Sequence, residues 1–152
     1  MKFCIKTSLL QSKDIVVSGF NKSLFDAVSP PFPPVKVIRY DGSQTGNIVE
    51  LELNFFVFKQ RWVSQIRDHG ETKQTTWFID EGTTLPFFLT YWRHTHKIHK
   101  TQTGSVIEDH VEFKSYPILD ILLFPLLYLQ FLYRIPMYRA FFNRQTNLTE
   151  TD

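Results

Sequence analysis

The fold is decided by two neighbouring stretches of sequence, Trp92-Arg93-His94-Thr95-His96-Lys97-Ile98 and Ser105-Val106-Ile107-Glu108-Asp109-His110-Val111. In each stretch, polar residues alternate with a set rich in apolar ones, which is typical of a β-strand with one buried face. The segment between them ends in Gly104 and predicts a hairpin turn over residues 100–104. Pairing the two strands gives a shared inner face that contains Trp92, His94, His96, Ile107, Asp109 and Val111.

Two histidines and an aspartate thus lie on the predicted inner face. If His99 pairs with Gly104, His94 lies opposite Asp109, close enough for the carboxylate to accept a hydrogen bond from the imidazole. A buried carboxylate without a partner is costly, so Asp109 requires this pairing or contact with water in a cavity. Three interpretations stay open: a structural pair that fixes strand register, a polar anchor for a mainly apolar ligand, and a catalytic dyad.

A metal site at these residues has only weak support in the sequence. His94 and His96 have the spacing that directs two imidazoles to one side of a strand, and Asp109 would be a third ligand. Such a set recurs by chance, and no further run of ligand residues accompanies it. We therefore expect no metal and no cofactor, and we assign no catalytic residues because the dyad has no obvious nucleophile beside it.

The rest of the chain has a similar pattern of strands separated by turn residues. Strands are predicted at residues 2–9, 35–40, 47–58, 61–67, 73–80, 87–99 and 105–114. A four-residue loop, Asp68-His69-Gly70-Glu71, would place Trp62 opposite Trp77 on one face. Apolar residues at helical spacing predict a short helix within residues 18–28, ended by the proline run of residues 30–34.

The most apolar segment predicts a long final helix from about Ile118 to Tyr133, bent at Pro125 and interrupted near Pro136. It falls short of the roughly 20 apolar residues that span a bilayer, so we expect a buried or cavity-capping helix and no stable membrane insertion. Its predicted packing face consists of Leu119, Leu122, Leu123, Leu126, Leu129 and Tyr133. The chain is therefore predicted to be an α+β protein in which a curved antiparallel sheet wraps around this helix and leaves a pocket between them.

Composition limits the partners of the protein. The 152 residues carry a net charge of +2, which argues against a nucleic-acid binder, and a single domain over residues 1–145 with a flexible tail over 146–152 is expected. Aromatic residues reach 16%, which suggests a cavity or interface lined with rings. Cys4 is the only cysteine and no signal-peptide core precedes the first strand, so we expect the cytoplasm.

Several motifs together resemble a known family. They are Ser29-Pro30-Pro31-Phe32-Pro33, Arg39-Tyr40-Asp41-Gly42, Phe78-Ile79-Asp80-Glu81-Gly82, Trp92-Arg93-His94-Thr95-His96, Asp109 and Phe131-Leu132-Tyr133-Arg134. The pattern resembles small bacterial ligand-binding proteins of the START-like (SRPBCC) superfamily over nearly the whole chain. The resemblance implies the helix-grip fold, in which about seven antiparallel strands grip a long C-terminal helix. It also implies lipids, sterols, polyketides, quinones or plant hormones as ligands, and some members are cyclases or hydrolases.

These observations lead to one expected function and two alternatives. We expect binding or transport of a hydrophobic small molecule, such as a lipid, polyketide or quinone-like compound, in a cavity between the sheet and the final helix, without chemistry. The candidate ligand contacts are Trp62, Trp77, Trp92, His94, His96, Ile107, Asp109, Val111, Leu122, Leu126 and Tyr133. The alternatives are a cyclase, dehydratase or hydrolase with His94 as base and Asp109 orienting it, and a protein-interaction module with a filled core. The oligomeric state is left open.

Overall fold

The computed structural model describes residues 1–149, with side-chain environments through Gln145. It consists of seven strands and three helices. They are β1 (Lys2–Leu9), α1 (Lys13–Ser18), α2 (Lys22–Ala27), β2 (Val35–Tyr40), β3 (Ile48–Asn54), β4 (Lys59–Glu71), β5 (Thr75–Thr84), β6 (Tyr91–Thr101), β7 (Gly104–Lys114) and α3 (Pro117–Thr149). This confirms the predicted α+β class with a seven-stranded sheet and a long C-terminal helix.

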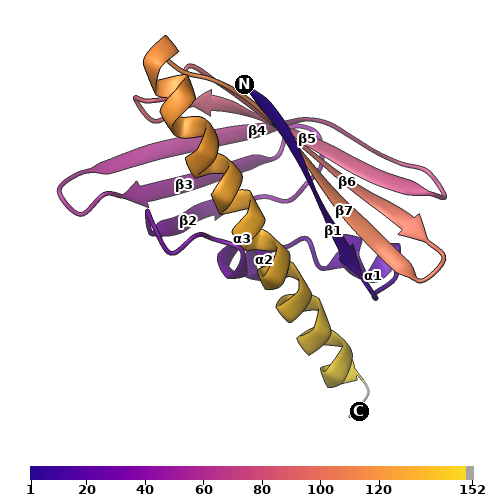
Figure 1. Ribbon diagram of the computed structural model, residues 1–152. Helices are drawn as coiled ribbons and strands as arrows, with labels where there is room; N and C mark the ends of the chain where they lie inside the picture. The colour runs from indigo at the N-terminus through magenta and orange to yellow at the C-terminus, as the bar shows by residue number, and fades with distance from the viewer. Residues whose placement is uncertain (150–152) are drawn as a thin grey trace.

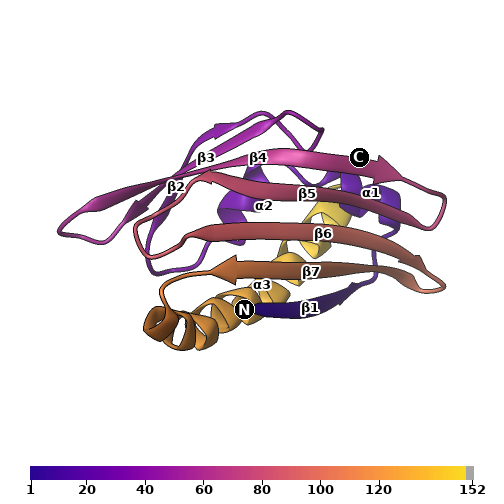
Figure 2. The same cartoon turned by 90° about the horizontal axis from the view of Figure 1, so that it is seen from above.

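The strands form one antiparallel sheet in the order β1-β7-β6-β5-β4-β3-β2. The sheet is curved, and all three helices lie on one of its faces, with α3 crossing that face diagonally (Figures 1 and 2). The two short helices begin at polar N-caps, because the side chains of Ser12 and Asn21 accept hydrogen bonds from the amides of Ile15 and Leu24. A sheet gripping a terminal helix is the helix-grip architecture that the sequence predicted.

The β6–β7 hairpin keeps the predicted faces but not the predicted register. Thr101 pairs with Gly104 across a two-residue turn, so His96 lies opposite Asp109 and His94 opposite Val111. The predicted pairing of His94 directly with Asp109 was therefore wrong by two residues. Because side chains alternate with a period of two, such a shift leaves the inner face unchanged.

The β4–β5 hairpin corrects a second prediction. Gly70 pairs with Trp77, and the turn follows β4 at Thr72 instead of occupying residues 68–71. Trp62 pairs with Leu51 on β3, so the expected Trp62–Trp77 pair does not form. Gly70 suits its position because a Cβ there would lie 2.3 Å from the Trp77 ring. Trp77 consequently lies on the outer face of the sheet, away from the helices.

Helix α3 is longer than predicted and continues through both Pro125 and Pro136. The predicted interruption near Pro136 was therefore wrong. Of the predicted tail, residues 146–149 continue the helix and residues 150–152 lie outside the described residues; the domain boundary at residue 145 stays a prediction. By length and composition, Pro117–Gln145 would suffice to cross a membrane, with a mean hydropathy of 1.7, and 17% of its most apolar window is buried.

The core divides into two clusters along α3. One lies under the first half of the helix and contains Ile5, Leu89, Trp92, Val111, Phe113, Leu123, Leu127 and Phe131. The other joins the second half to α1, α2 and the middle of the sheet, and contains Leu9, Val16, Leu24, Val28, Ile66, Phe78, Ile98, Ile107, Tyr138 and Phe142. The first cluster is called the apolar seam below.

Candidate functional site

Four polar side chains meet on the inner face of the sheet, between the two core clusters. Asp80 lies on β5, His94 and His96 on β6, and Asp109 on β7, so three adjacent strands supply one group. His94, His96 and Asp109 keep 3%, 6% and 1% of their accessible surface. These four residues are called the inner polar cluster, and their burial means that their charges must be balanced locally.

Asp109 is the centre of the cluster. Its Oδ1 lies 3.0 Å from Nε2 of His94, in a hydrogen bond, and 2.9 Å from Nδ1 of His96. The approach from His96 falls short of hydrogen-bond geometry and leaves that buried nitrogen without a partner. Asp80 is oriented separately, because the indole Nε1 of Trp92 donates to its Oδ1 over 3.1 Å.

Burial changes the pKa values of the residues in the cluster in different directions. It lowers the pKa of His94 to about 3, with neighbouring His96 adding to the effect, so this imidazole is neutral near pH 7. It raises the pKa of Asp80 to about 6. Burial also opposes ionisation of Asp109, but the two imidazoles at its oxygen outweigh that effect and hold its pKa below the ordinary value. Asp109 is therefore the permanent negative charge of the cluster.

Helix α3 contributes two further polar groups. Arg134 and Tyr138 line a small cavity together with Asp80 and His96. The guanidinium carbon of Arg134 lies 4.1 Å from the centre of the Phe131 ring, an arrangement that suits a cation near the face of an aromatic ring. Tyr138 is fully buried, and this burial raises its pKa. The second half of α3 thus covers the inner polar cluster on the side that faces away from the sheet.

One cavity between the sheet and the helices lies beside the inner polar cluster, and it is small. The cavity beside the inner polar cluster has a volume of about 30 Å³ and is bounded elsewhere by α2, the β2–β3 region and Phe78. Such a volume is enough for about one water molecule. It is well below the roughly 300 Å³ at which pockets for drug-sized ligands begin. A ligand of that size would enter only if the side chains or α3 moved.

The apolar seam continues from the cluster toward the start of α3. Trp92 contacts Trp62 edge-to-face with ring centres 4.8 Å apart, and Phe131 lies edge-on to the His94 ring at 4.9 Å. Val111 is fully buried there, and Ile107 is fully buried in the other core cluster. Of the predicted ligand contacts, the structure therefore brings Trp62, Trp92 and Val111 to the seam and His94, His96 and Asp109 to its polar end.

Four predicted contacts lie elsewhere. Trp77 is on the outer face of the sheet, whereas Leu122, Leu126 and Tyr133 lie on the exposed side of α3. Of the predicted packing face of the helix, Leu119 and Leu123 do pack against the seam, but the other four residues are exposed and Leu127 and Phe131 complete the buried stripe. This stripe has the i, i+4, i+8 spacing of one helical face, but in a segment apolar all round the sequence does not single it out.

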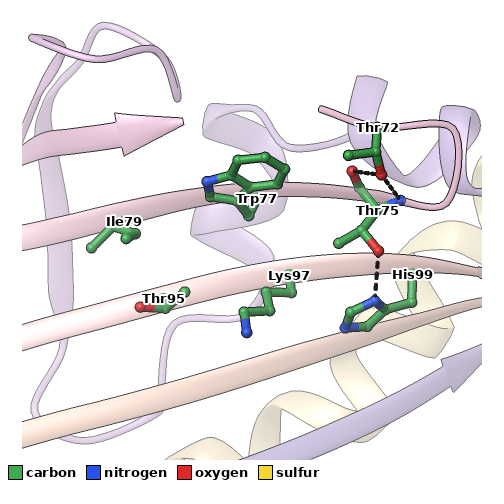
Figure 3. Close-up of a pocket in the computed structure, with 7 residues that line it drawn as sticks. All are labelled: Thr72, Thr75, Trp77, Ile79, Thr95, Lys97 and His99. Carbon is green, nitrogen blue, oxygen red and sulfur yellow. Dashed lines mark hydrogen bonds between the residues drawn. The ribbon is translucent and has the colours of Figure 1, made fainter. Parts of the chain in front are cut away.

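Trp77 belongs to a broad hollow on the outer face of β5 and β6, shown in Figure 3. Its volume is about 580 Å³, and its lining consists of Thr72, Thr75, Trp77, Ile79, Thr95, Lys97 and His99. The side chain of Thr75 contacts Nδ1 of His99 at 2.9 Å. These side chains stand on one side of a sheet and do not enclose a ligand, so we do not place the functional site here.

Sequence reasoning missed Asp80, Arg134 and Tyr138 as members of the site. Asp80 was named only within the motif of residues 78–82 and was given no face; three residues from Trp77 along one strand, it lies on the opposite side of the sheet. Arg134 and Tyr138 lie one helical turn apart, at the i, i+4 spacing that places two residues on one face. This spacing would have indicated a shared face if the helix had been predicted to continue past Pro136.

No protein-family model matches the chain, and no curated protein matches it in sequence. Solved structures match it in fold. A protein from Nitrosomonas europaea aligns with a TM-score of 0.70 at 10% identity over 97% of each chain. The Zhui aromatase/cyclase from a Streptomyces species aligns at 0.65 and 9% identity over 96% of this chain and 94% of its own.

The di-domain aromatase/cyclase StfQ, from the steffimycin biosynthetic pathway, aligns at 0.69 and 10% identity over 96% of this chain and 52% of its own. Identities this low show the fold and not the activity. The helix-grip fold predicted from the sequence is confirmed by the structure and by these structural matches.

Proposed function

We propose that the protein binds one mostly apolar small molecule between the sheet and the first half of α3, and does so without chemistry. The observation that carries the proposal is the apolar seam, which is lined by aromatic and aliphatic side chains and ends at a few polar groups. Ligand sites usually combine such a lining with few, placed polar groups. A lipid, a polyketide or a quinone-like compound has the matching chemistry, and two of the solved structures with this fold are aromatase/cyclases.

Binding requires the seam to open, because its side chains pack against one another and each keeps at most 8% of its surface exposed. The first half of α3 is the element suited to move. It contacts the sheet through one stripe, and its opposite side exposes Ile118, Ile121, Leu122 and Leu129. Pro125 and Pro136 each remove a backbone hydrogen bond from the helix, which weakens it at both ends of the intervening segment.

The inner polar cluster and Arg134 would orient the polar end of the ligand. Arg134 lies at the cavity and carries a permanent charge, so it suits an anionic or carbonyl oxygen. The catalytic alternative has less support, because a histidine with a pKa of about 3 is a poor general base near pH 7. As part of the same proposal, we place the protein in the cytoplasm, consistent with a lone cysteine.

One observation favours a second candidate, the protein-interaction module. The side chains of the seam pack against one another, and the outer side of α3 exposes the apolar residues Ile118, Ile121, Leu122 and Leu129. Exposed apolar surfaces of this kind mark contact sites. In that case the interior would serve only as a core, and no small molecule would be bound.

The test compares Trp92, which lies in the apolar seam, with Trp77, which lies on the outer face of the sheet. Fatty acids, quinones and sterol-like probes are titrated against the wild type, Trp92→Phe and Trp77→Phe while thermal stability is followed. Binding to the native state raises the melting temperature with ligand concentration. We expect the wild type and Trp77→Phe to be stabilised alike, and Trp92→Phe to require more ligand.

Mass analysis of an organic extract of the purified protein complements the titration. An apolar compound at near-equimolar amount would support the proposal and identify the ligand class. If no probe stabilises the wild type and the extract holds no such compound, the interaction module is the better account. If ligand binding is weakened equally in Trp92→Phe and Trp77→Phe, the ligand site does not lie in the seam.

A further inference from the structure

A second site, of a different chemistry, is present in the inner polar cluster. Asp80 on β5 lies directly opposite His94 on β6, and His96 follows two residues later on the same face. Each of the three side chains offers one ligand atom, and these atoms lie within 4.8 Å of one another. Two imidazoles and one carboxylate form a donor set typical of divalent transition metals.

The orientation of His94 strengthens this interpretation. The carboxylate of Asp109 accepts at 3.0 Å from Nε2 of His94, so Nδ1 is the ring nitrogen that is left to face Asp80. This nitrogen lies 4.0 Å from Oδ2 of Asp80, too far for a hydrogen bond. A carboxylate that fixes the far nitrogen of an imidazole is the usual outer partner of a metal-binding histidine.

A gap of this size between an imidazole nitrogen and a carboxylate oxygen can be bridged by a metal ion or by a water molecule. The cavity of about 30 Å³ that contacts Asp80 and His96 has room for one small ion or water molecule. Arg134 lines the same cavity and opposes a cation, but two carboxylates, Asp80 and Asp109, outnumber it. A divalent ion would leave this group of residues with a small net charge.

We propose that Asp80, His94 and His96 bind one divalent transition-metal ion, of the class that includes Zn²⁺, Co²⁺ and Fe²⁺. Asp109 is a positioning residue that holds the His94 ring, and Trp92 holds the Asp80 carboxylate through its indole hydrogen. Three protein ligands leave at least one coordination position for water or for an oxygen of a bound ligand. All three ligand atoms come from protein side chains, so metal binding does not require the apolar ligand.

A competing set of ligand residues lies on the outer face and provides the control. Cys4, Glu108 and His110 also place three ligand atoms within 4.8 Å of one another. They are engaged already, since Glu108 bonds to His110 and lies 2.7 Å from Nζ of Lys6. A cation there would have to displace the lysine, so we assign the metal to the inner site.

The experiment uses the full chain, stripped with a chelator and dialysed, and titrated with Co²⁺. We expect one equivalent to bind with visible d–d bands and without a thiolate-to-cobalt charge-transfer band, and Zn²⁺ to displace it. Asp80→Asn and His96→Gln should raise the dissociation constant more than tenfold. Asp109→Asn should raise it about 10- to 100-fold, as loss of an outer partner does.

Cys4→Ser and His110→Gln are the matched controls and should bind Co²⁺ as the wild type does. Circular dichroism establishes that each variant is folded; Asp80→Asn keeps an oxygen for the Trp92 hydrogen bond. Absence of Co²⁺ and Zn²⁺ binding by the wild type would overturn the proposal. So would unchanged binding by folded Asp80→Asn and His96→Gln, or loss of binding in Cys4→Ser, which would place the metal on the outer face.

Discussion

The two halves of α3 pack against the sheet in different ways. The second half buries Tyr138 and Phe142 completely, and these rings share a core cluster with α1, α2 and the centre of the sheet. The first half buries Leu123 to 8% exposure, while its neighbour Leu122 remains 66% exposed. One half is enclosed on several sides, and the other lies on the sheet along a single stripe.

This difference separates the structural role of the helix from its functional role. A ring enclosed by three elements is costly to displace, so the second half fixes α3 on the sheet. A segment with one buried stripe and an internal proline, Pro125, loses fewer contacts on moving. The ligand proposal depends on that contrast, because only a movable first half gives access to the seam.

The largest expected effect is at the enclosed end. Phe142→Ala removes a fully buried ring that lies against Gly19 of the α1–α2 connection, where a Cβ would come within 2.4 Å of it. We expect a loss of about 3–5 kcal/mol in the free energy of unfolding, as for other buried phenylalanines. Urea denaturation measures it. Phe87→Ala, at an exposed ring, should change stability by about 0.5 kcal/mol or less.

Adjacent leucines test the stripe in the first half. Leu123→Ala should cost about 2–5 kcal/mol, near the lower end if the helix relaxes into the space. Leu122→Ala should stay within about 0.5 kcal/mol, because its side chain is largely exposed. Denaturant midpoints at unchanged m-values provide the comparison. Equal costs at the two positions would mean that the outer side of α3 is covered in solution.

The sequence predicts those parts of the fold that depend on periodicity. The inner face of β6 and β7 was correct despite a register error of two residues, because the hydrophobic pattern repeats every second residue. The register itself depends on the turn, where Gly104 with φ of +150° begins β7 directly after a two-residue connection. The same residues are also compatible with a longer loop over residues 100–104, so the composition of the turn does not determine the strand register.

The errors at the candidate site have a common origin. The β4–β5 pairing shifts between Ile66 and Asp68, and such a bulge has no reliable sequence signal. Together with the misplaced turn, it led to the prediction that Trp77 lies opposite Trp62 among the ligand contacts, whereas Trp77 lies on the outer face. On α3, apolar residues surround the helix, so no amphipathic pattern indicates which leucines face the sheet.

The smallest expected effect concerns the anchor of α1, which covers the enclosed half of α3. Lys13 is buried, with a side chain 7% exposed, and its Nζ lies 2.5 Å from Oε1 of Glu71 at the end of β4. The hydrogen bond from Lys13 lowers the pKa of Glu71 below its ordinary value. The pair therefore stabilises the fold above the unfolded-state pKa of Glu71, and the contribution is lost as the pH falls through the folded-state pKa.

Glu71→Gln should consequently lower the urea midpoint of unfolding slightly at pH 7, and the difference from the wild type should vanish as both are acidified below about pH 4. The effect is small because the Glu71 side chain is 61% exposed and Lys13 keeps Thr72 and Thr76 as acceptors. Glu52→Gln is the control, since it removes a 2.8 Å pair whose lysine, Lys59, is exposed. A larger midpoint change for Glu71→Gln than for Glu52→Gln at pH 7 would show that burial of Lys13 matters to the enclosed half. Equal changes would mean that α1 is held by Val16 and the neighbouring core alone.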